Sequence, residues 1–118
     1  MKPLRVAILF RHSLLASGLA SRLSEHPNQV QIQMIDAGSP DAASQLCAAA
    51  PAIVIVDASD ADTTANMPIA RLLDVTPQAK VLRLDARNDH IRIFSSTERR
   101  AKGTGELIAV MQDVSGNE

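Results

Sequence analysis

The sequence predicts an α/β fold in which a mainly parallel sheet carries helices on both faces. Short apolar runs alternate along the chain with segments whose apolar residues recur at helical spacing. The resulting order is strand, helix, strand, helix, strand, helix, strand, strand, helix, which is typical of parallel strands joined by helical crossovers. With 118 residues, of which 46% are hydrophobic, the chain has the size and composition of one domain with a buried core.

The first half of the chain predicts two strands and two helices. Residues 4–10 form an almost continuous apolar run, which indicates a strand buried on both faces, and residues 29–35 alternate polar and apolar, which indicates a half-buried strand. Between them a helix begins near Ser13, with the apolar residues Leu15, Leu19 and Leu23. Residues 39–41 predict a second helix start, followed by an apolar face of Ala43, Leu46, Cys47 and Ala50. We expect the Cys47 thiol to be a small buried hydrophobic group.

The second half predicts three further strands. Residues 52–57 are a continuous apolar run that ends in an aspartate, the strongest buried-strand signal in the chain. A polar loop, expected to be solvated, follows over residues 58–65, and a short helix over residues 68–73. Two more strands are predicted over residues 80–85 and 90–94. The last helix has an apolar face made of Leu107, Val110, Met111 and Val114.

The loop between the last two strands is too short for a parallel pair. Parallel neighbours need a crossover of about a dozen residues, whereas the four residues 86–89 suit a hairpin. Antiparallel pairing around that loop places the apolar residues on one face, which we expect to be packed, and the polar ones on the other. The polar face contains Arg83, Asp85, His90 and Arg92. Arg83 then lies opposite Arg92, so this face is either a solvated surface or a candidate interaction face whose like charges a partner neutralises.

Composition argues against several classes of function. The net charge of −1, from 12 basic and 13 acidic residues, indicates neither nucleic acid nor an anionic membrane as a partner. Aromatic residues make up 2% of the chain, so a base-stacking surface is not expected. One cysteine and three widely separated histidines predict no cysteine or histidine metal site, and the lone cysteine fits a reducing, cytoplasmic location. We expect neither a signal peptide nor a bilayer span.

Three stretches of the chain resemble the receiver domain of two-component response regulators. They are residues 5–9 leading into residues 12–19, residues 51–57, and residues 77–82. The resemblance implies a flavodoxin-like, receiver-like, doubly wound sheet of five strands over residues 1–118, as a single domain with no output domain. It also implies that the family's fourth helix, part of its usual switching surface, is missing here.

The resemblance implies that Asp57 is the phosphoacceptor-like residue, because receivers carry their acceptor aspartate at the end of the third strand. Receivers hold Mg²⁺ partly with an acidic pair after the first strand, where this chain has Phe10 and Arg11. A hydroxyl usually ends their fourth strand and a lysine their fifth, and here Asp85 and Ser95 (or the serine after it) take those places. An antiparallel fifth strand would put Ser95 at the wrong end of the sheet.

We expect this site to be degenerate. An Arg11 guanidinium about 4 Å from the Asp57 carboxylate would attract it by roughly 4 kcal/mol at a dielectric constant of 20, and would repel a divalent cation. Asp85 supplies a second carboxylate, so Mg²⁺ binding is expected to be weakened or absent.

The sequence therefore predicts a pseudo-receiver: a non-enzymatic signalling domain with no catalytic residue, no cofactor and no resident metal. It would act through contacts with other signalling proteins, and a homodimer is a candidate assembly. The main alternative is a phosphoaccepting receiver of a two-component phosphorelay that uses Asp57. A more distant alternative is a flavodoxin-like domain that binds a ligand beyond the carboxyl ends of its strands.

Overall fold

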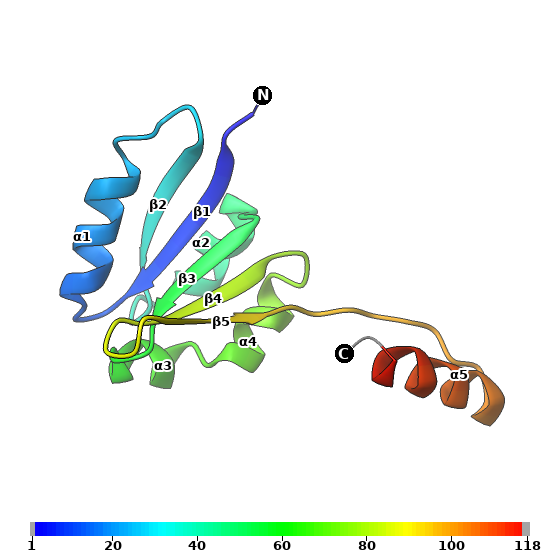
Figure 1. Cartoon of the computed structure of the whole chain (residues 1–118). Coiled ribbons are helices and arrows are strands. Elements are labelled where there is room, and N and C mark those ends of the chain that lie inside the picture. Colours follow the sequence, from blue (N-terminus) through cyan, green and yellow to red (C-terminus); the bar gives the residue numbers. More distant parts are fainter. Residues whose placement is uncertain (1, 117–118) are drawn as a thin grey trace.

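The apolar runs assemble into one mixed sheet in a computed structural model that describes residues 2–116 (Figure 1). Its strands are β1 (Leu4–Phe10), β2 (Val30–Asp36), β3 (Ile53–Asp57), β4 (Lys80–Asp85) and β5 (His90–Phe94). They lie in the order β2-β1-β3-β4-β5; the first four run parallel, whereas β5 pairs antiparallel with β4. The architecture is α/β with a five-stranded sheet, and is consistent with a flavodoxin-like fold.

Within residues 2–116, four helices cover the two faces of the central strands: α1 (Leu14–Leu23), α2 (Ala42–Ala49), α3 (Ala61–Asn66) and α4 (Ile69–Val75). A fifth helix, α5 (Thr104–Ser115), does not pack on them. On one face, Ala16 and Leu19 of α1 pack on Ile8 and neighbouring strand residues. On the other, Leu46 of α2 and Leu72 of α4 enclose the larger cluster, which includes Leu9, Val54 and Val81. Alternate residues of the strands point to these two cores, because side chains of a strand alternate between faces.

Two expectations about the central part of the chain are wrong. Residues 61–66 form α3 rather than a solvated loop, since the Asp60 carboxylate caps the helix by accepting from the Thr63 amide at 3.2 Å. Both residues are buried. In α2, Ala42 and Leu46 face the core, whereas the neighbouring Cys47 lies to the side of this buried face and is exposed.

The β4–β5 pair is a hairpin with the register expected from its loop length. Arg83 lies opposite Arg92 and Asp85 opposite His90. The turn includes Asp89, whose φ of 53° lies in the left-handed region. The guanidinium carbon of Arg83 lies 5.5 Å from the centre of the Phe94 ring, which gives this cation an aromatic neighbour across the pair.

The outer part of the sheet departs from the expectation of a packed apolar face. Ile91 and Ile93 are 61% and 63% exposed, because α1 does not reach across to β5. The last helix, α5, does not cover them either: it stands apart from the sheet at the end of an extended segment (Figure 1). No residue of α5 from Thr104 to Ser115 is buried.

No helix within residues 2–116 has both the length and the apolar character needed to cross a membrane.

Candidate functional site

The polar residues of interest gather at the carboxyl ends of the parallel strands. Asp57 ends β3, Asp36 ends β2, and Arg11 directly follows β1. Open α/β sheets bind their ligands at this edge, where the loops after the strands converge. The edge is therefore the candidate functional site of the chain.

Asp57 is buried, with only 6% of its surface exposed. One of its oxygens accepts a hydrogen bond from the Ser13 hydroxyl at 2.7 Å. The other accepts from the Ser59 hydroxyl at 2.7 Å and from the Ser59 amide at 2.9 Å. The Ser13 hydroxyl also caps α1, since its oxygen accepts from the Ala16 amide at 2.9 Å. Hydroxyl groups of the chain thus engage both oxygens of the carboxylate.

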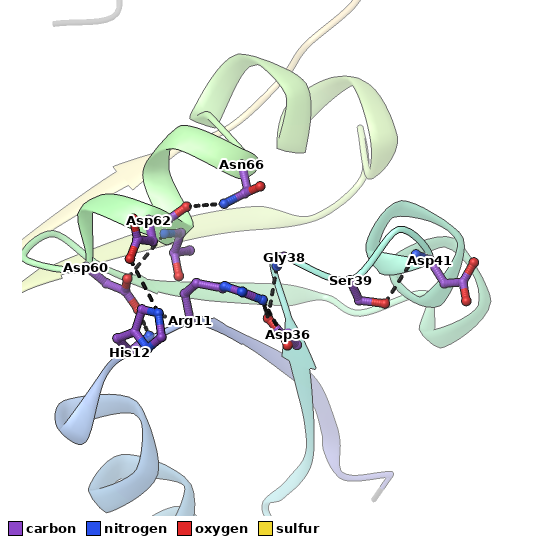
Figure 2. A network of polar contacts seen from close by, with 10 residues as sticks. Arg11, His12, Asp36, Gly38, Ser39, Asp41, Asp60, Asp62 and Asn66 are labelled. Atoms are coloured by element: carbon purple, nitrogen blue, oxygen red, sulfur yellow. Dashed lines mark hydrogen bonds and ion pairs between the residues drawn. The ribbon is translucent and has the colours of Figure 1, made fainter.

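Arg11 does not neutralise Asp57, and the expected guanidinium–Asp57 pair is wrong. Its Nη1 atom instead donates to both oxygens of Asp36, at 3.0 and 3.2 Å, as Figure 2 shows. The amide of Gly38 donates to the same carboxylate at 2.9 Å. This amide and the Arg11 side chain hold the pKa of Asp36 below its ordinary value. The physical reason is reach: the long Arg11 side chain extends along the sheet edge to β2 instead of folding back over β3.

Gly38 provides the space for this pair. A Cβ atom built on it would lie 1.9 Å from Nη1 of Arg11, so any larger residue there requires the guanidinium to move. The guanidinium therefore lies directly against the backbone of the loop after β2, next to the carboxylate that it binds.

Asp60 joins the loop after β1 to the start of α3. One oxygen accepts from the backbone amides of Arg11 and His12, at 2.9 and 3.1 Å, and the other from the Thr63 amide. Burial raises the pKa of Asp60, but these hydrogen bonds to the ionised form outweigh burial and leave the pKa below its ordinary value. The Asp60 carboxylate is thus a structural anion that fixes the position of the loop carrying Arg11.

His12 lies at the surface near this junction. Its Nε2 atom is 3.5 Å from a carboxylate oxygen of Asp62, and both side chains are largely exposed (Figure 2). An exposed pair of this kind contributes little to stability. The contact places His12 against α3 rather than against Asp57.

The other residues that the resemblance places beside Asp57 make no hydrogen bond to it in the structure. Asp85 accepts from the Arg87 amide at 3.1 Å and from the Asn88 side chain at 3.0 Å, so it closes the hairpin turn. The Asn88 side chain and the Arg87 amide lower the pKa of Asp85. Phe10 packs in the core under α1. Ser95 follows Phe94, which pairs with Val81 near the start of β4, and therefore lies toward the end of the sheet away from Asp57.

The candidate interaction face of the hairpin, Arg83, His90 and Arg92, is assembled as one surface by the antiparallel register. His90 and Arg92 are exposed, whereas Arg83 is half-buried, with its guanidinium over the Phe94 ring. This face lies on the α4 side, since Val81 and Phe94 of the same face belong to the core there.

At this edge, the carboxylates of Asp57 and Asp60 hold the loops after β1 and β3 together. Among residues 2–116, no three histidine, cysteine or acidic side chains converge as a group that could hold a metal. Sequence reasoning missed four partners in the cluster, namely Ser13, Asp36, Ser59 and Asp60. The spacing of Asp60 and Thr63 is a helix-capping signal that could have identified one of them. Nothing in the sequence pattern indicates which carboxylate Arg11 binds.

Comparisons of the chain with protein-family models, with curated proteins and with solved structures found no match.

Proposed function

We propose that this chain is a pseudo-receiver, a non-enzymatic signalling domain that acts through contacts with other proteins and not by phosphotransfer. One observation carries the proposal: both oxygens of Asp57 are engaged by the hydroxyls of Ser13 and Ser59. An acceptor carboxylate must present one oxygen to the phosphorus atom, and a Mg²⁺ ion must gather the phosphoryl oxygens beside it. A carboxylate oxygen has two lone pairs. The Ser59 amide and hydroxyl occupy both on one oxygen, and Ser13 occupies one on the other, so at least the Ser59 donors must move before Asp57 could take both roles.

The neighbouring carboxylates support the same proposal, because each already has partners of its own. Asp36 is paired with Arg11, Asp60 accepts from three backbone amides, and Asp85 closes the hairpin turn. A Mg²⁺ ion at this edge would have to replace these contacts as well as its own water shell. The position of the family's acidic pair is taken by Phe10 and Arg11, neither of which is an oxygen ligand.

The sheet supports a receiver-like ancestry with an altered signalling surface. Doubly wound sheets of the flavodoxin type place their strands in the order 2-1-3-4-5, and this chain has the order β2-β1-β3-β4-β5. The turn at residues 86–89 replaces the family's fourth helix. A domain without that helix needs other surfaces for its partners. The proposal places it in the cytoplasm, where signalling receivers act.

Incubation with Mg²⁺ and acetyl phosphate, followed by intact-mass measurement, tests this proposal. We expect the mass to remain that of the unmodified chain. An adduct of about 80 Da that is absent from Asp57→Asn would overturn the proposal and favour the phosphoaccepting alternative. Asp74→Asn, which changes an exposed carboxylate on α4, is the matched control for the substitution itself.

A further inference from the structure

The β5 side of the β4–β5 hairpin presents apolar side chains that no element within residues 2–116 covers, whereas Leu82 and Leu84 of β4 also pack against the cluster under α1. Leu82 and Leu84 on β4 stand opposite Ile93 and Ile91 on β5, so these four side chains form one strip, here called the hairpin strip. The two isoleucines are 61% and 63% exposed. The strip continues into an apolar groove of about 270 Å³ between the hairpin turn and Leu15 of α1. Soluble domains rarely leave such a continuous apolar surface in water.

Helix α5 also has an exposed apolar side. Leu107, Ile108, Met111 and Val114 are 48–63% exposed and lie on one side of the helix, since their spacing follows the helical repeat. A helix of this composition gains most of its stability by packing this side against another element. The described part of the chain offers it no such partner within its own fold (Figure 1).

The two surfaces match in length and in chemistry. A helix of 12 residues is about 18 Å long, and the five-residue strand β5 spans about 17 Å. The polar residues Glu106 and Asp113 lie away from the apolar side of α5, so docking that side would leave both carboxylates in water. A helix lying along the hairpin strip would also complete the second layer beside α1.

The connection between β5 and α5 favours a second copy of the chain as the partner. Residues 95–103 form a nine-residue segment without helix or strand, which can span about 30 Å. Neighbouring elements of one domain are usually joined by about 2–6 residues. The segment leads away from its own sheet (Figure 1). An ion pair between Arg99 and Asp113 links it to α5. Residues 95–115 thus form an arm that stands apart from its own hairpin strip.

We propose that two copies of this chain form a dimer by exchanging their arms, with α5 of each copy on the hairpin strip of the other. Such an exchange is symmetric and closed, and it covers all four apolar surfaces at once. A 12-residue helix covers a strip about 18 Å long and about 10 Å wide. Because both partners bury this strip and the contact occurs twice, the two helix contacts alone bury about 700 Å². The crossing segments 95–103 must contribute the rest of the about 1,000 Å² that a specific interface needs. This inference is independent of the state of Asp57.

A pair of complementary variants of the full chain tests the exchange. The arm variant Leu107→Asp/Met111→Asp keeps its hairpin strip, and the strip variant Ile91→Asp/Ile93→Asp keeps its arm. We expect the unmodified chain to sediment as a dimer of two 12.6 kDa chains, and each variant alone to sediment as a monomer. An equimolar mixture of the two variants should form a dimer held by one intact contact, weaker than the dimer of the unmodified chain, since the arm of the strip variant can still dock on the strip of the arm variant.

The outcomes separate exchange from the other arrangements. Ala109→Asp, which adds the same charge on the opposite side of α5, is the matched control and should remain a dimer. The proposal is overturned if the unmodified chain is a monomer at all concentrations tested, which would mean that α5 folds back on its own strip or stays free. It is equally overturned if both variants remain dimers, or if their mixture associates no more than either variant alone at the highest concentration tested, while each retains the circular dichroism of the folded chain.

Discussion

At the scale of single residues, the carboxylates of the site serve to hold loops together. Asp57 accepts from the hydroxyl that caps α1, and Asp60 caps α3 while accepting from the amides that follow β1. A buried carboxylate needs such donors, because ionised groups are costly to remove from water without hydrogen bonds. The two loops after β1 and β3 are therefore fixed relative to one another by two aspartates.

Removing the Ser13 hydroxyl should destabilise the fold. Ser13→Ala removes the cap of α1 and one of the donors to buried Asp57, and we expect the free energy of unfolding to fall by about 1–3 kcal/mol. Urea denaturation measures the change. The control Ser21→Ala replaces an exposed serine within the same helix and should change stability by less than about 0.5 kcal/mol. Equal effects of the two substitutions would contradict the role given to Ser13.

Asp60 should make stability depend on pH in the acid range. Its pKa in the folded state lies below the ordinary value of about 3.9. The ionised carboxylate of Asp60 therefore contributes its full stabilisation above about pH 4–5, and this stabilisation is lost as the pH falls through the pKa of Asp60 in the folded state. Asp60→Asn should lower stability at pH 7 by about 1–3 kcal/mol and should flatten the loss between pH 5 and pH 2. If the free energy of unfolding fell with pH in the same way for the unmodified chain and for Asp60→Asn, this role of Asp60 would be excluded.

At the residue level, the sequence predicted where Asp57 lies along the backbone. It did not predict which carboxylate the long side chain of Arg11 contacts. Asp57 lies at the end of β3, as the apolar run before it indicates. The partner of Arg11 was mispredicted, because several carboxylates lie within reach of a flexible guanidinium at the same edge. Only the loop conformation after β2, with Gly38 leaving space beside the guanidinium, selects Asp36.

At the scale of elements, strands were predictable because their signals are local. The limits of β1, β4 and β5 agree with the expected ranges, since a run of apolar residues bounded by turn residues has few alternatives. The register of the hairpin followed from a loop of four residues. The helix α3 was missed because its six residues contain little periodicity, and a buried capping carboxylate decides its formation.

The end of α2 offers a stabilising substitution. Ala50 follows the helix with a φ of 45°, a conformation that a Cβ atom makes unfavourable and that glycine adopts readily. We expect Ala50→Gly to raise the free energy of unfolding by about 1 kcal/mol. Ala48→Gly, within the same helix and exposed, should instead lower it by about 0.5–1 kcal/mol. Thermal unfolding of both variants checks the opposite signs.

The like charges across the hairpin should cost measurable stability. Arg83 and Arg92 face one another in the register, so Arg92→Glu replaces repulsion by attraction and should stabilise the chain by about 0.2–1 kcal/mol at low salt. The gain should shrink as salt is added, since exposed charges are screened. Arg100→Glu makes the same change of charge in the extended segment and should show no such gain. A gain that is independent of salt would argue against this electrostatic origin.

At the scale of the whole molecule, the expectation of a packed apolar face on the hairpin is wrong for its β5 side. The spacing of its apolar residues gives α5 an apolar side, yet a periodic pattern says only that a helix packs, and not on which surface. The same limit applies to the hairpin strip, whose apolar alternation predicts burial without naming a partner. Both surfaces remain exposed in a single chain, and their joint exposure is what the sequence alone did not reveal.

If the two surfaces meet between copies, the thermal stability of the chain must depend on its concentration. When a dimer unfolds, it also dissociates, so each tenfold rise in concentration stabilises the folded state by about 1.4 kcal/mol per mole of dimer, or about 0.7 kcal/mol per chain. For a chain of 118 residues this raises Tm by several degrees over a hundredfold range, at roughly 4 °C per kcal/mol. Met111→Asp should remove the dependence, while Ala109→Asp should keep it, because only Met111 lies on the apolar side of α5. A Tm of the unmodified chain that does not move with concentration would mean that the exposed side of α5 contributes nothing to assembly.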